Sequence, residues 1–255
     1  MSSLVLKIIA IVSMAIDHVG WNLYSQSYDA YIIMRLVGRI AMPIFCFLIA
    51  QGFRKTSDPL RYASRLAVAA LISEIPFNLC FSSNGSIVKY GSLNVMVTLF
   101  LGLAGLIMFD WIKKRTGLMI TAIIPSLLMA LFAELVGSDY GFYGIVLILM
   151  FYLIDLESKY APSYIFAACL LFGARSIIEF VLRSALATVI PSIVVSPLKD
   201  WDVMQLLAAF SALLLVFYNG KAGKRPQNRV ARAVVKYSFY LFYPIHLIII
   251  WLVFR

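Results

Sequence analysis

The chain has 255 residues, of which 62% are hydrophobic and 13% charged, and its mean hydropathy is +0.92. Soluble domains carry charges on about a quarter of their residues, so this composition excludes a soluble protein and indicates an integral membrane protein. The formal net charge of +10 is also a feature of nucleic-acid-binding proteins, but cytoplasmic loops of membrane proteins carry the same excess of Lys and Arg. We therefore expect a lipid bilayer as partner, and no nucleic acid.

The predicted elements are apolar helices, because the hydrophobic stretches approach the roughly 20 residues that a helical span needs. They lack the short alternating pattern of an outer-membrane barrel. We predict an all-α, polytopic transmembrane helix bundle of about nine spans, forming a single domain over residues 1–255. Residues 4–24 are too long and polar-ended for a signal peptide and are interpreted as the first span. The expected spans are 4–24, 30–52, 62–80, 93–112, 117–136, 140–155, 162–181, 201–219 and 237–254.

Basic residues fall in alternate loops, after the second, fourth and eighth predicted spans. The positive-inside rule puts these loops in the cytoplasm, so the N-terminus is expected inside and the C-terminus outside. Residues 182–200 are apolar, but a further span there would upset this alternation. We expect them to form an interfacial or re-entrant segment on the outer side.

Several ionisable residues fall at one depth within the first three predicted spans. A rise of about 1.5 Å per residue places His18 roughly 21 Å from the inner boundary of a ~30 Å core, Arg39 roughly 13 Å below the outer boundary and Glu74 roughly 18 Å from the inner side. Arg35 lies one turn from Arg39, where like charges repel. We expect Asp17 and Glu74 to balance the two arginines.

Other polar residues extend this layer. His246 comes near the midplane on the last span, while Asn78, Asn94 and Asp139 lie closer to the outer surface. Asp17 and His18 are adjacent, so they should point to different sides of their helix. A buried ion-pair cluster that only fixes helix packing is one interpretation. Two histidines, two arginines and two carboxylates at one depth favour a water-accessible cavity.

The cytoplasmic mouth of the bundle has a different character. Gln51 and Arg54 end the second predicted span, and the segment YNGKAGKR (218–225) follows the eighth. Its glycines permit close approach of the backbone to a ligand, and its cations suit phosphates. The alternative is a solvated loop that only sets the membrane orientation.

Seven motifs, in order over nearly the whole chain, resemble the TraX family. They are IDHVG (16–20), RIAMPIFCFLIAQGF (39–53), SEIPFN (73–78), NVMVTLFLG (94–102), DYGFYG (139–144), YNGKAG (218–223) and FYPIH (242–246). This family comprises polytopic bacterial membrane proteins and is named for the acetyltransferase that modifies the N-terminus of the conjugative F-pilin subunit. The first and last spans are also similar to wider membrane acyltransferases that acetylate surface glycans from cytosolic acetyl-CoA. The first-helix histidine of that group corresponds best to His18.

The resemblance implies an acetyl-CoA-dependent N- or O-acetyltransferase in the bacterial cytoplasmic membrane, acting on a pilin-like protein N-terminus or a glycan. His18 is then the expected general base. Arg39 is expected to stabilise the oxyanion, held by Glu74, with Asp17 in the same catalytic layer. Acetyl-CoA is expected at Gln51, Arg54, Asn219, Lys221, Lys224 and Arg225. The acceptor is expected at Arg35, Asn78, Asn94, Asp139, Tyr140, Tyr143 and His246.

Two other functions remain open on the sequence. A carboxylate, histidine and arginine cluster at mid-membrane depth also suits a proton-coupled transporter, although no inverted repeat supports one. A non-catalytic assembly factor for pili or another envelope complex is the other alternative. No metal is expected, because the three cysteines, Cys46, Cys80 and Cys169, have no ligand spacing.

Overall fold

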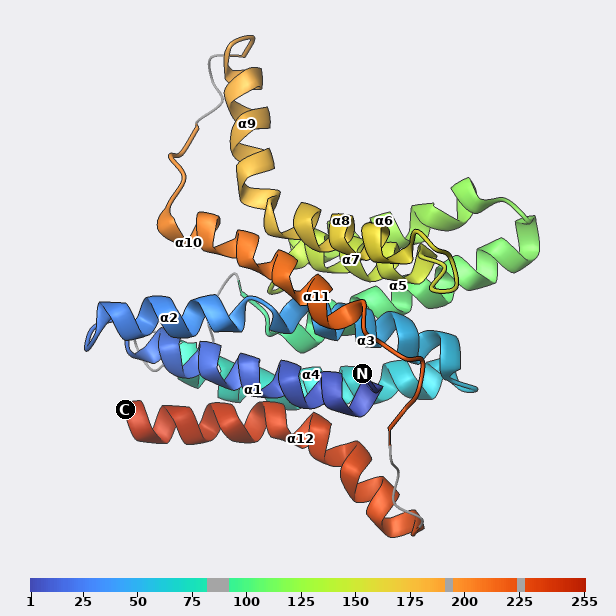
Figure 1. Cartoon of the computed structure of the whole chain (residues 1–255), viewed down its shortest axis with the longest axis horizontal. Coiled ribbons are helices and arrows are strands. Elements are labelled where there is room, and N and C mark those ends of the chain that lie inside the picture. The colour runs from blue at the N-terminus through green and yellow to red at the C-terminus, as the bar shows by residue number, and fades with distance from the viewer. Residues whose placement is uncertain (82–91, 191–194, 224–227) are drawn as a thin grey trace.

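The computed structural model describes residues 1–81, 92–190, 195–223 and 228–255. Within these ranges all named elements are helices, and the only strand-like feature is an isolated bridge between Leu93 and Ser138. The all-α prediction is therefore confirmed. Most helices run along one long axis, and α9 projects from the side of the bundle (Figure 1).

The first four helices form one side of the bundle and carry most of the predicted polar layer. They are α1 (Ser3–Asn22), α2 (Tyr28–Gly38), α3 (Ala41–Lys55) and α4 (Pro59–Phe81). Helices α2 and α3 together form the second predicted span, broken at Arg39 and Ile40. Pro43 has no N–H to donate to the Arg39 carbonyl, which accounts for a break at this point.

The middle of the chain supplies five helices: α5 (Val95–Thr116), α6 (Met119–Leu135), α7 (Gly141–Leu153), α8 (Ala161–Gly173) and α9 (Arg175–Ala187). Gly117 ends α5 in the left-handed conformation, with a φ of 71° that glycine adopts without strain. Helices α8 and α9 meet at a bend of 60°. The seventh predicted span is therefore not one straight helix.

The last part of the chain returns along the bundle twice. Helix α10 (Asp200–Met204), the 3₁₀ helix η1 (Gln205–Phe210) and α11 (Ser211–Leu215) follow one another, and α12 (Arg229–Phe254) closes the chain. Pro244 lies inside α12. The N-terminal half of α12 bends away from the bundle (Figure 1), as expected of a helix with an internal proline.

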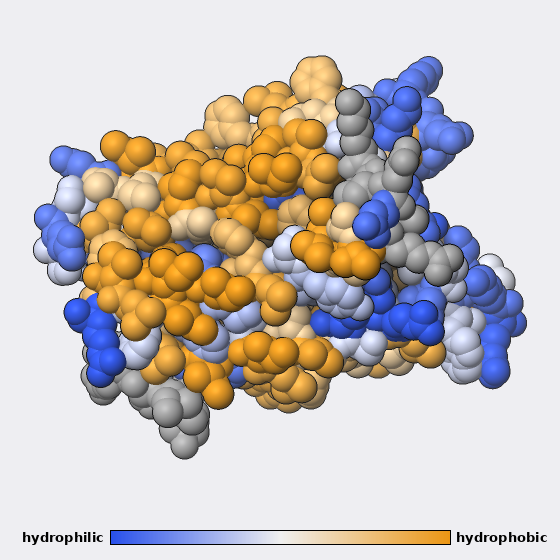
Figure 2. All heavy atoms as spheres, turned by 90° about the horizontal axis from the view of Figure 1, so that it is seen from below, coloured by the Kyte–Doolittle hydropathy of each residue, from blue (hydrophilic) through white to orange (hydrophobic). Residues whose placement is uncertain are grey.

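The helices have the lengths and surface of an integral membrane protein. Among the described residues, five stretches are long and apolar enough to cross a membrane: α1, α2 with α3, α4, α5 and most of α12. There are six if α8 and α9 count as one bent span. The predicted spans 117–136, 140–155 and 201–219 coincide with shorter apolar helices. The count of nine spans and the cytoplasmic N-terminus stay predictions. Figure 2 shows hydrophobic side chains over the middle of one face and hydrophilic ones toward the two ends.

The basic loops gather at one end of the bundle. Lys55, at the end of α3, donates to the Tyr218 hydroxyl at 2.7 Å and to the Gly220 carbonyl at 2.5 Å. Arg54 donates to the Ile154 carbonyl, at the end of α7, at 2.6 Å. These contacts join the loops that follow α3, α7 and α11. Two of the three basic loops, those after the second and eighth predicted spans, thus lie at one end of the structure.

Helix α9 has the amphipathic character of an interfacial helix. Arg175, Glu179 and Arg183 recur every four residues along one face, whereas Val181 and Leu182 are exposed apolar side chains. A helix of this type, turned away from the bundle axis, is typical of a segment lying in the membrane surface. This geometry supports the interfacial interpretation for residues 182–187, the last part of α9. Residues 191–194 of the predicted segment 182–200 lie outside the described residues.

Candidate functional site

Asp17 is the centre of a buried cluster of charges between α1 and α2. Its Oδ2 atom accepts from Nη1 of Arg35 at 2.5 Å, and its Oδ1 atom accepts from Nη2 of Arg39 at 2.5 Å. A Cβ atom on Gly38 would overlap the Asp17 carboxyl group. The absence of a side chain at Gly38 therefore lets one carboxylate fit between two arginines.

The Arg39 guanidinium is held by three different partners. Besides Asp17, it donates from Nε to the Arg35 carbonyl at 3.1 Å and from Nη1 to Oε1 of Gln205 at 2.9 Å. Arg39 is only 8% exposed, so these contacts compensate the removal of its charge from water. Gln205, on η1, was not predicted as a site residue. A polar residue inside the apolar segment 201–219 was the available signal.

Glu74 does not pair with Arg39, and that prediction is wrong. Its Oε2 atom accepts from the backbone N of Asn94 at 3.2 Å and from the Asn94 amide at 2.6 Å. Helix α4, which carries Glu74, packs against α5 and α12, whereas Arg39 reaches α1 and η1. Depth along the membrane placed the two residues at one level, but they face different neighbours.

Asn94 has a structural position at the start of α5. It is fully buried, and its side chain accepts from the N of Met96 and donates to the Ala70 carbonyl at 2.9 Å as well as to Glu74. These bonds cap α5 and tie it to α4. Asn78 is buried nearby on α4. Neither side chain lies on an open surface where an acceptor substrate could reach it directly.

His18 and His246 form a hydrogen-bonded pair between α1 and α12. The distance from Nδ1 of His18 to Nε2 of His246 is 2.8 Å, and the two rings are within 10° of parallel. His18 is flanked by the edges of Phe81 and Tyr243. As predicted, Asp17 and His18 point to different sides of α1, toward α2 and α12.

The hydrogen bonds of this pair define the tautomers of both rings. Nδ1 of His246 lies 2.8 Å from the Phe242 carbonyl, and a carbonyl can only accept. For neutral rings, His246 therefore carries its proton on Nδ1 and accepts at Nε2, so Nδ1 of His18 is the donor. Nε2 of His18 is left with its lone pair, as a general base requires.

A second polar group lies between α9 and the start of α7. Tyr140 has a φ of 62°, which is rare for a residue other than glycine. The Arg175 guanidinium stacks on the rings of Tyr140 and Tyr143 at 5.4 and 5.9 Å, and the Tyr143 hydroxyl donates to Glu179 at 2.5 Å. Burial raises the pKa of Asp139, in the loop between α6 and α7, to about 6 against the opposing charges of Arg39 and Arg175.

Arg175 is thus a member of the site that was not predicted. Its Nη1 atom is buried and has no hydrogen-bond partner among the described residues. It brings together Tyr140 and Tyr143, two of the predicted acceptor residues, with Asp139 close by. An ionisable residue inside the predicted span 162–181 was the signal that could have indicated it.

The residues predicted to bind acetyl-CoA have different environments. Arg54 donates to the Tyr152 and Ile154 carbonyls, where it caps the end of α7. Gln51 is buried, with an Nε2 atom that has no partner among the described residues. Asn219 shapes the following turn by accepting from the N of Lys221 at 3.1 Å, which leaves the Lys221 side chain exposed. Lys224 and Arg225 lie outside the described residues.

Apolar helices around a buried layer of charged and imidazole side chains define a polytopic membrane protein with an internal polar site. The chain belongs to the TraX family, because the family model described as TraX protein matches residues 2–254. This confirms the resemblance found in the sequence.

Two relatives match the chain to different extents. It is 28% identical over 254 residues to the "Probable fimbrial assembly protein FimC, serogroup H1" of Dichelobacter nodosus, covering 96% of this chain and 93% of that protein. It is also 31% identical over 97 residues to an uncharacterized protein of Rickettsia prowazekii, covering 38% of this chain and 33% of that protein. No solved structure matches the chain.

Proposed function

We propose that this protein is a membrane-embedded acyltransferase that moves an acetyl group from cytosolic acetyl-CoA to an amine or hydroxyl of an envelope or exported acceptor. One observation carries the proposal. The His18 ring is held by His246 in the tautomer that leaves Nε2 free to accept a proton. Asp17, the preceding residue, faces the other side of α1 and binds two arginines, whose charges act on the His18 ring.

The proposed reaction needs one base and no covalent enzyme intermediate. Nε2 of His18 removes a proton from the acceptor as its nitrogen or oxygen attacks the thioester carbonyl. When the tetrahedral intermediate collapses, the carbon–sulfur bond breaks and the His18 imidazolium returns the proton to the CoA thiolate. His246 is a positioning residue in this scheme, because its Nε2 accepts from Nδ1 of His18 throughout.

The arginine pair supports the proposal through its charge. One carboxylate, Asp17, faces two guanidinium groups, so a positive charge remains to stabilise a developing oxyanion. Arg39 uses three of its five N–H groups in the contacts described. Its remaining donors are the proposed oxyanion ligands, with Asp17 in the holding role that had been expected of Glu74.

The two ends of the bundle suit the two substrates. Acetyl-CoA is polyanionic, and the exposed Lys221 lies at the end of the bundle where the basic loops are. We therefore propose that acetyl-CoA binds at this end. The acceptor is proposed to enter from the opposite side, near Tyr140 and Arg175. The fimbrial assembly protein among the relatives favours a pilin-like acceptor.

The second candidate is a non-catalytic factor in pilus or envelope assembly. The name of the fimbrial assembly protein among the relatives favours this function. It is also favoured because Arg39 already donates hydrogen bonds to three groups of the protein itself. The two functions are separated by purified protein in proteoliposomes, supplied with labelled acetyl-CoA and either a peptide with a free N-terminus or an amino sugar. Acyl transfer that is lost in His18→Ala supports the enzyme. Absence of label on both acceptors from a folded protein supports the assembly factor.

A further inference from the structure

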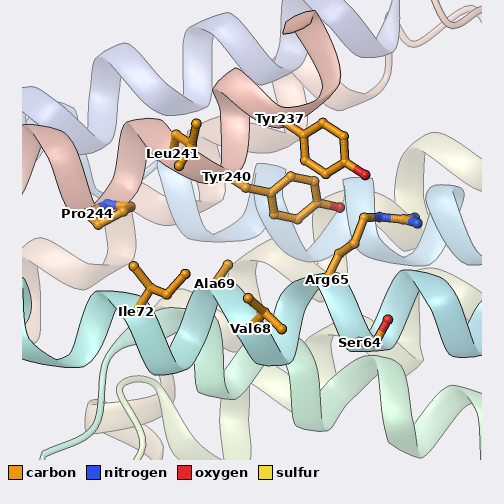
Figure 3. A pocket seen from close by; sticks show the side chains of 9 residues that line it. All are labelled: Ser64, Arg65, Val68, Ala69, Ile72, Tyr237, Tyr240, Leu241 and Pro244. Atoms are coloured by element: carbon orange, nitrogen blue, oxygen red, sulfur yellow. The ribbon is translucent and has the colours of Figure 1, made fainter. Parts of the chain in front are cut away.

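The bend of α12 opens a groove between α12 and α4, on the opposite face of α12 from His246. Its volume is about 330 Å³. Figure 3 shows side chains of α4 on one wall and of α12 on the other. The lining residues on α4 recur from Ser64 to Ile72, so the groove follows the helix for about 12 Å. It is a channel along the bundle rather than a closed cavity.

Most of the groove is apolar, and it borders the outer surface of the bundle. Val68 and Ile72 on α4 and Leu241 on α12 line it, and each of these side chains is more than half exposed. In a membrane protein such exposed apolar side chains face lipid. The interior of the groove therefore offers contact to a flexible hydrocarbon chain and few partners for polar groups.

The end of the groove nearest the basic loops is cationic. Arg65 lines it. The Arg65 side chain hydrogen-bonds the Tyr240 hydroxyl and its guanidinium lies over the Tyr62 ring, while its Nε atom is buried without a hydrogen-bond partner among the described residues. Figure 3 shows the ring of Tyr240 directed toward the Arg65 guanidinium, with Tyr237 beside it. The charge of this guanidinium, with N–H groups left over beside phenol hydroxyls, fits an oxygen-rich anion such as a phosphate group.

We propose that this groove binds an anionic phospholipid of the leaflet at the basic end of the bundle. One acyl chain lies along Val68, Ile72 and Leu241, and the phosphate is bound by Arg65. The pantetheine arm of acetyl-CoA suits the groove poorly, because its amides would lose hydrogen bonds in an apolar channel. A protein helix, about 10 Å wide with its side chains, is too large for this volume. The proposal does not depend on acyl transfer.

The test is lipid binding to the full-length purified protein, measured by native mass spectrometry with phosphatidylglycerol and phosphatidylcholine of identical acyl chains. We expect phosphatidylglycerol to bind more tightly. Arg65→Gln should weaken it about tenfold or more, as expected for loss of one charge-assisted hydrogen bond. Phosphatidylcholine binding should fall less, because its choline cation offsets the charge of its phosphate. Arg115→Gln is the matched control, because Arg115 is an exposed arginine that stacks on Trp111 outside the groove.

A second variant tests the chain site separately from the phosphate site. Val68 is 55% exposed, so Val68→Trp can place its ring in the groove with little effect on the core. It should reduce binding of phosphatidylglycerol while the thermal midpoint stays unchanged. Equal affinity for the two lipids, or an equal loss in Arg65→Gln and Arg115→Gln, would overturn the proposal. Unchanged phosphatidylglycerol binding in Val68→Trp would overturn the chain site.

Discussion

His18 and His246 are 228 positions apart in the chain, yet their ring nitrogens lie 2.8 Å from each other between the first and last helices. The carbonyl of Phe242, on the other side of His246, orients the pair. The first and last spans therefore have to pack together before the proposed base exists.

His18→Ala should lower the turnover of acetyl transfer by about 10²–10⁴-fold, the usual contribution of a general base. The KM for acetyl-CoA should change little, because the proposed nucleotide site is at the basic end of the bundle. The measurement is steady-state kinetics of purified protein in proteoliposomes. Turnover close to that of the unmodified protein would remove His18 from the mechanism.

His246→Ala should lower turnover less than His18→Ala, because it releases the orientation of the base but leaves the base present. His246→Gln should recover part of the loss, since an amide oxygen can accept from Nδ1 of His18. The pH–rate profile should shift in His246→Ala, whereas a residue needed only for packing would lower the amount of folded protein without moving the profile. A loss in His246→Gln as large as in His246→Ala would contradict the positioning role.

Asp17→Asn should destabilise the fold by about 3–5 kcal/mol, because it leaves the buried Arg39 and the partly buried Arg35 without the carboxylate that pairs with both. A second change, Arg39→Gln, should restore part of the stability of Asp17→Asn, although activity stays lost. Thermal unfolding in detergent measures both effects. Glu74→Gln is the comparison, and it should cost less, since Glu74 caps α5 and contacts neither arginine. An equal loss of stability in Asp17→Asn and Glu74→Gln would contradict the pairing of Asp17 with Arg35 and Arg39.

Gly38→Ala should destabilise the protein although alanine favours helices, because the new Cβ atom overlaps the Asp17 carboxyl group. Overpacking of this kind typically costs about 1–3 kcal/mol, so the thermal midpoint should fall by several degrees. Val37→Ala, at an exposed position of the same helix, is the matched control and should change the midpoint little. A midpoint of Gly38→Ala equal to that of the control would show that α1 and α2 are farther apart.

Lys221→Glu should raise the KM for acetyl-CoA several-fold, and more strongly at low salt because exposed charges are screened. Lys159→Glu, another lysine at the basic end, is the control and should have a smaller effect. Arg54→Ala should instead lower stability, since its guanidinium caps α7. A KM that is unchanged in Lys221→Glu at every salt concentration would move the nucleotide site elsewhere.

Hydrophobic patterning predicted where the helices are in the sequence. It did not predict how each helix is rotated about its own axis, and so which neighbours its side chains face. Each predicted span coincides with helix, and depth along the membrane grouped His18 with His246 and Asp17 with the arginines. Depth is one coordinate, however, and it also grouped Glu74 with Arg39, which the rotation of α4 separates. The contact of Arg39 with Gln205, 166 positions away, depends on tertiary packing that periodicity does not encode. The bend between α8 and α9, just before Arg175, was also not predicted from periodicity.

Acyl transfer across the bundle can be measured directly in sealed inside-out vesicles. Labelled acetyl-CoA is supplied only to the cytoplasmic face, now outside the vesicle, and the acceptor is trapped in the lumen. We expect label on the trapped acceptor, and none in vesicles that carry His18→Ala. Label that appears only when acceptor and acetyl-CoA share the cytoplasmic face would contradict transfer across the bundle, because the acceptor would then be modified before it crosses the membrane.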